Sequence, residues 1–290
     1  MTAASIALGV GGDALLGDPR RFHPVAGFGR AATAFEGVAY RPTRRAGAAY
    51  AAVLVGVVVG SAALAERVLP RTLVRAVALW AALGGRSLAR EAQAVADLVE
   101  RGEIDAARTR IRSLVGRDPQ QLDGTGLCKA AIESVAENTV DAVIAPLFWV
   151  AVAGAPGVLG HRAINTLDAM VGKRNERYAR FGTASARADD VANWPAARLA
   201  GLLVGNREAW SAGAKAHPSP NAGVVEAAFA GALGVALGGT LAYAGRVEHR
   251  PVLNPDGREP GPHDVARAIS LARRISLATA VLAAAGSRRR

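Results

Sequence analysis

Three carboxylates recur at four-residue intervals in the stretch AIESVAENTVDAVIAPLFW, residues 131–149: Glu133, Glu137 and Asp141. On an α-helix these positions share one face, where like charges repel each other. A divalent cation is a natural offset, since Mg²⁺ prefers carboxylates together with substrate phosphates. Asn138 adds a neutral amide beside Glu137. The row therefore predicts a metal or substrate site, with a solvated acidic helix face as the alternative.

A second group of polar side chains occupies INTLDAMVGKRNERYARFGTASARADDVANWPAAR, residues 164–198. Carboxylates, amides and cations mixed in this way suit a metal-bridged phosphate or another anionic ligand. A basic loop with incidental charge pairs is the alternative. The candidate residues are Asn165, Asp168, Lys173, Arg174, Arg177, Asp189, Asp190 and Asn193.

A third group lies near the N-terminus, in GDPRRFHPVAGFGR, residues 17–30. It contributes Asp18, Arg20 and His23, and its Gly and Pro residues predict a shaped loop rather than a helix. A lone histidine is more often structural than a ligand. The position of His23 before a proline in a polar loop leaves both readings open.

A fourth group lies in HPSPNAGVVEAAFAGALG, residues 217–234, with His217, Ser219 and Asn221 as candidates. Either Ser219 or Asn221 is expected to cap the helix that follows. Glu226 lies in the first turns of that helix. An acid there can support the helix dipole, and an acid inside a membrane is otherwise a functional candidate.

Several standard chemistries are missing from the sequence. It has no GxxxxGK[ST] loop, no HExxH and no G-x-S-x-G, which argues against a Walker-type nucleotide site, a zincin and an α/β-hydrolase. Its five histidines are scattered, and Cys128 is alone, so the chain has no internal disulfide and no Cys-rich metal site.

The composition is more hydrophobic than is usual for a soluble protein. Of 290 residues, 51% are hydrophobic and 20% are charged, with a formal charge of +11 carried mostly by arginine. An excess of positive charge can favour the binding of nucleic acid, anionic lipid or an anionic substrate. It can also simply reflect codon bias. No aromatic-rich basic stripe accompanies it, so nucleic acid is not an expected partner. The N-terminus lacks the features of a signal peptide.

Long apolar runs predict how these residues are positioned. Ala46–Ala65 and Ala222–Gly245 are each long enough to cross a bilayer core of about 30 Å. The arginines at 41–45 suggest a cytoplasmic flank before the first run. Ala142–Gly160 contains two prolines and several glycines and is predicted to be a broken or re-entrant helix. The run at Ile275–Gly286 is short, so the final helix is expected to fall short of a comfortable span.

Residues 86–115 differ, because charges alternate over apolar positions at helical spacing. This pattern predicts an amphipathic, water-facing helical hairpin broken near Gly102. Strand signals are almost absent. The sequence therefore predicts an all-α, polytopic membrane helical bundle, with residues 1–290 as a single integral membrane domain and 86–141 as a water-facing insertion within it. Buried core helices of an Ala-rich globule are the alternative.

The four polar groups, in this order, resemble the adenosylcobinamide-phosphate synthase family of cobalamin biosynthesis, the CobD/CbiB family. The matching stretches are those quoted above, the preceding GRDPQQLDGTGLCK, the following GVALGGTLAYAG, and RPVLN at 250–254. They cover well over a third of the chain. Lys129 stands where a basic residue is expected near the start of its helix, and the region after Asn254 carries little resemblance.

The resemblance implies a multi-pass enzyme of the cytoplasmic membrane. Such enzymes join a carboxylate of adenosylcobyric acid, a corrinoid, to (R)-1-amino-2-propanol or its O-phosphate in an amide, consuming ATP with Mg²⁺. Implied partners are these substrates and membrane lipid, with other corrin-pathway enzymes or a second copy of the chain as further possibilities.

Roles follow from the resemblance as hypotheses. Glu133, Glu137, Asp190 and His23 are the catalytic candidates, and an acid or His23 accepts a proton from the amine. The metal candidates are Asp141, Asp168 and Asp189, with Glu133 and Glu137 or Asp190 as further ligands. The other residues are candidates for substrate and phosphate binding: Asp18, Arg20, Asn138, Asn165, Lys173, Arg174, Arg177, His217, Ser219 and Asn221.

If these groups form one site, the N-terminal loop, the acid row and the Asp-Asp pair must converge at the membrane edge or in a polar cavity. Two other functions stay open. One is a different Mg²⁺-dependent membrane transferase, because NTLDAM and ADDVANW faintly resemble the Asp-rich motifs of prenyltransferases. The other is a non-catalytic membrane scaffold for corrin enzymes.

Overall fold

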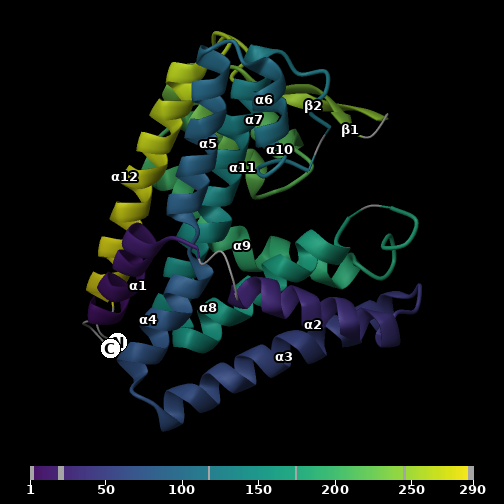
Figure 1. Cartoon of the computed structure of the whole chain (residues 1–290), viewed down its shortest axis with the longest axis vertical. Coiled ribbons are helices and arrows are strands. Elements are labelled where there is room, and N and C mark those ends of the chain that lie inside the picture. The colour runs from purple at the N-terminus through teal and green to yellow at the C-terminus, as the bar shows by residue number, and fades with distance from the viewer. Residues whose placement is uncertain (1–2, 19–22, 117, 174, 244–245, 287–290) are drawn as a thin grey trace. The chain divides into compact units, whose positions relative to one another are not determined.

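The computed structural model describes residues 3–18, 23–116, 118–173, 175–243 and 246–286, and most of them are helical (Figure 1). The predicted all-α class is confirmed. The longer helices are α1 Ala3–Leu16, α2 Pro24–Ala39, α3 Arg44–Val68, α4 Arg71–Ala82, α5 Gly85–Glu100, α7 Gly124–Thr139, α8 Ala145–Val171, α9 Thr183–Val204, α11 Ala222–Leu233 and α12 Pro262–Gly286. The shorter elements are α6 Ile104–Ile111, η1 Val140–Ile144, η2 Arg207–Trp210, α10 Ala212–Ala216, and the strands β1 Leu237–Tyr243 and β2 Arg246–Leu253.

The chain divides into two compact units, which are described separately. Unit 1 comprises residues 1–84, 141–195 and 279–290, and unit 2 comprises residues 85–140 and 196–278. Three of the four boundaries fall within helical stretches, at 140–141, 195–196 and 278–279, and the fourth lies between α4 and α5, at 84–85. The single membrane domain with an insertion at 86–141 stays a prediction.

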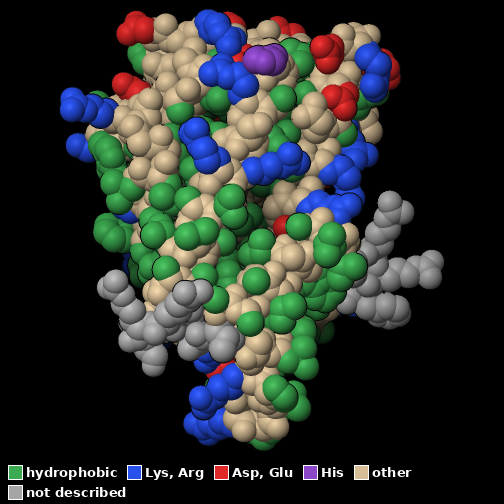
Figure 2. Space-filling model, turned by 90° about the vertical axis from the view of Figure 1, so that its left-hand side faces the viewer, with side chains coloured by type: hydrophobic (Ala, Val, Ile, Leu, Met, Phe, Trp, Pro, Cys, Tyr) green, Lys and Arg blue, Asp and Glu red, His purple; other side chains and the backbone are tan. Residues whose placement is uncertain are grey.

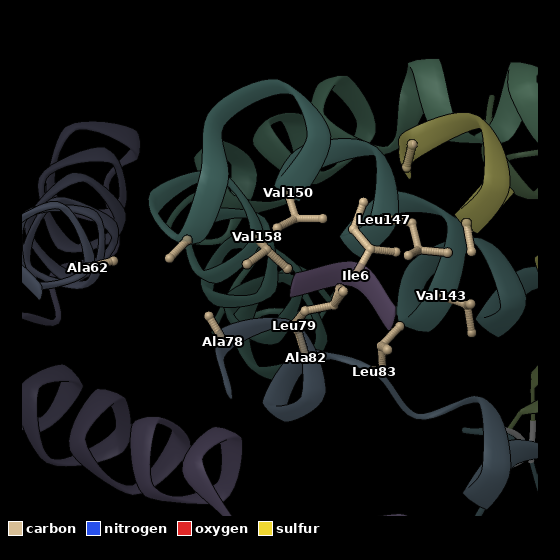
Figure 3. Packing of buried hydrophobic residues seen from close by; sticks show 13 residues of the cluster. Ile6, Ala62, Ala78, Leu79, Ala82, Leu83, Val143, Leu147, Val150 and Val158 are labelled. Carbon is tan, nitrogen blue, oxygen red and sulfur yellow. The ribbon is translucent and has the colours of Figure 1, made fainter. Parts of the chain in front are cut away.

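Unit 1 is built around α8. Its main hydrophobic cluster joins α1, α4 and α8 through side chains such as Ile6, Leu79, Leu147 and Val158, which point toward one another (Figure 3). A second cluster surrounds Tyr50 of α3. In Figure 1, α2 and α3 run alongside each other. These helices bury one side of α8, including Leu147, Val158 and Leu167.

By length and composition, three helices can cross a membrane: Arg44–Val68, the joined Gly124–Val171 and Pro262–Gly286. Only 11% of the apolar part of α3 is buried within the protein. Large hydrophobic side chains such as Val57 and Leu64 are exposed along it. Figure 2 shows many hydrophobic side chains exposed on one face. Lipid is the environment in which such a surface is stable.

The prediction that Ala222–Gly245 spans a membrane is wrong. Helix α11 ends at Leu233, and Gly234 caps it in the left-handed conformation, with φ of 70°. The chain then forms β1, which pairs antiparallel with β2. Glycine enters the left-handed region without steric cost, so it ends a helix that apolar composition would continue. This β-hairpin was not predicted from the sequence.

The final helix is longer than predicted. It begins at Pro262 and runs for 25 residues. Asp264, in its first turn, pairs with Arg258 and Arg267 and accepts a hydrogen bond from the backbone N–H of Gly261. These bonds fix the N-terminal turn of α12, and the two arginines balance the charge of Asp264. The helix therefore begins well before the apolar run that starts at residue 275.

The amphipathic hairpin lies in unit 2 as α5 and α6. Leu88, Ala92 and Val95 are buried, and Gly102 turns the chain with φ of 76°. The predicted break near Gly102 is thus confirmed.

Candidate functional site

Two acids from distant segments meet on one amide in unit 1. The Nδ2 of Asn165, on α8, donates to Asp141 Oδ2 and to Asp189 Oδ1, each at 3.2 Å. Asp141 comes from η1 and Asp189 from α9. The structure thus brings the last acid of the row together with the Asp-Asp pair.

Asn193 also binds Asp189, and His161 in turn contacts Asn193. The Nδ2 of Asn193 donates to both carboxylate oxygens of Asp189 at 3.1 Å, and its Oδ1 lies 2.8 Å from His161 Nε2. His161 and Asn193 are both buried. Because Asn193 accepts at that oxygen, His161 carries its proton on Nε2. The sequence reasoning missed His161, whose only signal is a polar residue inside an apolar helix.

Burial raises the pKa of Asp189, and the neighbouring charge of Asp190 raises it further. The hydrogen bonds from Asn165 and Asn193 oppose this shift by stabilising the charged form. A buried carboxylate with two amide donors and a second acid beside it is suited to accept a cation or a proton.

Arg162 is the second residue that sequence reasoning missed. Its Nη1 lies 3.5 Å from Asn165 Oδ1, and its Nε is buried without a hydrogen-bond partner. The carboxylates of Asp141 and Asp18 are the charges that attract its guanidinium. An arginine within an apolar helix is itself a signal, because a charge in a membrane segment is costly and usually functional.

The N-terminal group contributes Asp18 and His23. His23 Nε2 lies 3.5 Å from Asp18 Oδ1, and its Nδ1 accepts the backbone N–H of Val25 at 3.1 Å. His23 therefore caps α2, which begins at Pro24. The prediction of a loop through residue 30 is wrong for its second half, because proline at N1 and the His23 cap start a helix there. Arg20 lies outside the described residues.

The remaining residues of the 164–198 group have other partners. Arg177 donates to Glu36 Oε1 at 2.9 Å, and its guanidinium lies 4.4 Å from the ring centroid of Tyr40. The carboxylate of Asp168 occupies the space that a Cβ on Gly172 would need. Lys173 lies just beyond the end of α8, and Arg174 lies outside the described residues.

The acids of the row differ in their surroundings. Glu133 is buried and its Oε1 accepts the backbone N–H of Gly238 at 2.8 Å, within unit 2. Glu137 is exposed. The α-helix changes to the π-helical η1 at Val140, and the wider turn rotates Asp141 away from the α-helical register. Asn138 donates to Ser134 O and Oγ.

The HPSPNAG stretch forms a buried polar cluster in unit 2. His217 Nε2 lies 3.7 Å from Glu226 Oε2, and each side chain is 3% exposed. Asn221 holds the N-cap position of α11 without a side-chain capping bond. Ser219 Oγ accepts the backbone N–H groups of Asn221 and of Ala222, the first residue of the helix. Asn221 Oδ1 instead accepts a bond from Arg198 at 2.7 Å.

Among the residues that the structure describes, no group of three or more His, Cys, Asp or Glu side chains could hold a metal ion. Asp141 and Asp189 form a pair on Asn165 instead. Mg²⁺ is commonly bound by one or two carboxylates plus substrate phosphates, so a pair is an adequate protein contribution.

The sequence model of the CobD/Cbib protein family matches residues 6–272. This chain belongs to that family. Its relatives include the cobalamin biosynthesis protein CobD of Mycobacterium tuberculosis (strain ATCC 25618 / H37Rv), 50% identical over 97% of this chain and 94% of the relative. The proteins of the same name from Chromobacterium violaceum and Rhodobacter capsulatus are 43% and 40% identical over at least 93% of each chain. No solved structure matches the chain.

Proposed function

We propose that this chain is a membrane-bound ligase that joins a carboxylate of adenosylcobyric acid to (R)-1-amino-2-propanol or its O-phosphate, consuming ATP. Membership of the CobD/Cbib family places the chain in cobalamin biosynthesis. The observation that carries the proposed reaction is the meeting of Asp141 and Asp189 on the amide of Asn165. Carboxylates held in this way suit phosphoryl transfer more than simple binding.

The proposed chemistry proceeds in two steps. A carboxylate oxygen of the corrinoid attacks the γ-phosphorus of ATP, which gives an acyl phosphate and ADP. The amine nitrogen then attacks the acyl carbon, the C–N bond forms, and phosphate leaves with the electron pair of the broken C–O bond. The proton lost by the amine passes to a base on the protein.

The residues on Asn165 fit Mg²⁺, because paired carboxylates and phosphate oxygens are its usual ligands. Asp141 and Asp189 would hold the ion, with Asp168 as a further candidate. The bound ion would neutralise charge on the phosphates. Asn165 and Asn193 fix the orientation of the carboxylates, and a cation would offset the charge repulsion between Asp189 and Asp190.

The base and the phosphate-binding cations remain proposals. His23, Asp190, Glu133 and Glu137 are the candidates for accepting the amine proton. Lys173 and Arg177 are candidates for phosphate contacts, although Arg177 would first have to leave Glu36.

We further propose that the chain crosses the cytoplasmic membrane several times. Three helices of sufficient length and apolar character support this. The corrinoid is bulky and partly apolar, so a site at a membrane edge would meet it together with a polar nucleotide.

The test is turnover by detergent-purified protein with adenosylcobyric acid and Mg²⁺–ATP, comparing aminopropanol with its O-phosphate. Formation of amide and ADP in equal amounts is expected with at least one amine. Alanine at Glu137 or at Asp190 should reduce turnover of a folded enzyme, and intact turnover in both variants would remove the roles given to them. Corrinoid binding without any product would favour the scaffold function.

A further inference from the structure

The ring of His161 stands at one end of a line of three side chains in unit 1. Its Nε2 lies 2.8 Å from Asn193 Oδ1, and Asn193 Nδ2 donates to both carboxylate oxygens of Asp189 at 3.1 Å. His161 and Asn193 are each only 2% exposed. Among the described residues, the contact with Asn193 is the single hydrogen bond of the ring, and Nδ1 is buried without a partner. His161 therefore reaches Asp189 through the amide of Asn193.

The side-chain amide of Asn193 has two possible orientations between its neighbours. In the observed one, its nitrogen faces Asp189 and its oxygen faces His161. An ionised carboxylate only accepts hydrogen bonds. A reversed amide would turn its oxygen toward Asp189, lose both bonds and place two acceptors against each other. The group that faces the amide oxygen therefore decides how firmly the observed orientation is held.

His161 holds that orientation only when it donates from Nε2. A neutral imidazole donates at one ring nitrogen and accepts at the other. With the proton on Nδ1, Nε2 would be an acceptor facing the acceptor Oδ1 of Asn193, and Nδ1–H would be a buried donor that no described residue accepts. A buried N–H group without a partner is rarer in proteins than a buried acceptor without one. The surroundings of Nδ1 therefore favour the Nε2–H tautomer, which is the one that holds Asn193.

We propose that His161 is a positioning residue for Asp189, because its Nε2–H fixes the amide of Asn193 in the orientation that donates to both oxygens of the carboxylate. Asn165 donates to Oδ1 of the same carboxylate at 3.2 Å. Two amides of fixed orientation thus hold the acid, and an acid held in this way reorganises less when it meets a cation. The effect of His161 on turnover rests on the proposed function, whereas the positioning itself does not.

Nitrogen-15 NMR of the full chain in detergent, labelled at histidine, tests the positioning without any reaction. The two ring nitrogens of a neutral histidine give separate signals, which show which nitrogen carries the proton. The chain has five histidines, and the signals that disappear in His161→Gln belong to His161. We expect a proton on Nε2. A proton on Nδ1 alone, or a mixture of the two tautomers, would overturn the inference.

Asp189→Asn tests the link between the ring and the carboxylate. This variant removes the charge that requires Asn193 to donate, so the amide is held less firmly and the Nε2 signal of His161 should move. Asp105→Asn, at a 94% exposed side chain in unit 2, is the matched control and should leave the signal in place. An unmoved signal in a folded Asp189→Asn protein would show that the ring and the carboxylate are not linked.

Turnover separates positioning from packing. His161→Leu fills the site without a donor, whereas His161→Gln keeps an N–H donor. If the ring only filled the core, leucine would replace it better than glutamine, because an incompletely bonded polar group is costly to bury. We expect His161→Leu to lower kcat by about 10–100-fold and His161→Gln to recover most of that loss. His263→Leu, at an exposed residue of α12, is the control for loss of an imidazole.

Equal losses in the leucine and glutamine variants would overturn the positioning role, as would full kcat in His161→Leu. If His161→Leu does not fold, the two NMR measurements still decide. The ligase and the positioning can also fail separately. A proton on Nε2 that responds to Asp189→Asn, in a wild-type chain that forms no amide product, would support the positioning and defeat the ligase. Amide formation by a chain with the proton on Nδ1 of His161 would do the reverse.

Discussion

The Oε1 of Glu66, on α3, accepts a hydrogen bond from the backbone N–H of Ala155 at 2.7 Å. Helix α8 breaks at this point, where Gly154 has φ of 66°. Arg75 binds both oxygens of the same carboxylate, at 2.7 and 2.9 Å. A break inside an apolar helix exposes a backbone N–H that lipid cannot satisfy. Glu66 satisfies it, so the broken helix predicted over Ala142–Gly160 is confirmed and has a physical cause.

Glu66→Ala should destabilise the protein strongly. The substitution leaves a half-buried Arg75 and the Ala155 N–H without their acceptor, and we expect a loss of about 3 kcal/mol in the free energy of unfolding. Thermal unfolding in detergent measures the change. Glu103→Ala removes an exposed partner of Arg101 and should cost less than about 1 kcal/mol. Similar losses in the two variants would contradict the role assigned to Glu66.

Gly154→Ala should also be destabilising. A Cβ there would lie 2.6 Å from Glu66 Oε1. The backbone of Gly154, with φ of 66° and ψ of −150°, lies in a region that essentially only glycine adopts, which costs another residue about 1–3 kcal/mol before any clash. Gly56→Ala, in α3, meets nothing within 4 Å and should leave stability equal or slightly higher, because alanine favours helix. The opposite order of melting temperatures would show that the break in α8 is not required.

Stability should fall as pH rises through the titration of Asp189. Its pKa is raised in the folded chain, so the folded state holds a proton that the unfolded state has already released. The contribution of this carboxyl to stability is therefore greatest at acid pH, and it declines from the usual carboxyl range, near pH 4, up to the raised pKa. Melting temperatures from about pH 4 to 7 should show this decline relative to Asp189→Asn. Asp105→Asn, at a 94% exposed side chain, should keep the wild-type dependence.

Asn165→Ala should reduce turnover by about a hundredfold, because small displacements of reacting groups have effects of that size. The variant removes the amide that orients both Asp141 and Asp189. Asn175→Ala, at an exposed turn where the side chain accepts the Tyr178 N–H, is the matched control and should retain activity. Assays at saturating substrate separate the loss of rate from a loss of binding. Unchanged turnover in a folded Asn165→Ala protein would place the chemistry elsewhere.

The sequence by itself determined the helical class, the length and apolar character of α3, the α5–α6 hairpin and the residues that carry the resemblance. Each of these depends on composition or on spacing over one or two helical turns, where the backbone period alone relates neighbouring side chains. Gly102 lies where the amphipathic pattern is already interrupted, so the end of that helix could be predicted. Gly234 ends α11 inside an uninterrupted apolar run, and nothing in that run predicts β1.

Only the tertiary structure decided which polar residues act together. The π-helical turn at Val140–Ile144 interrupts the α-helical register at Asp141, and 24 residues on either side of Asn165 had to fold back before its amide could bind Asp141 and Asp189. The unpaired Nε of Arg162 depends on what surrounds it in three dimensions. Burial and long-range pairing determine the free energy of such polar groups, and neither can be predicted from the local sequence.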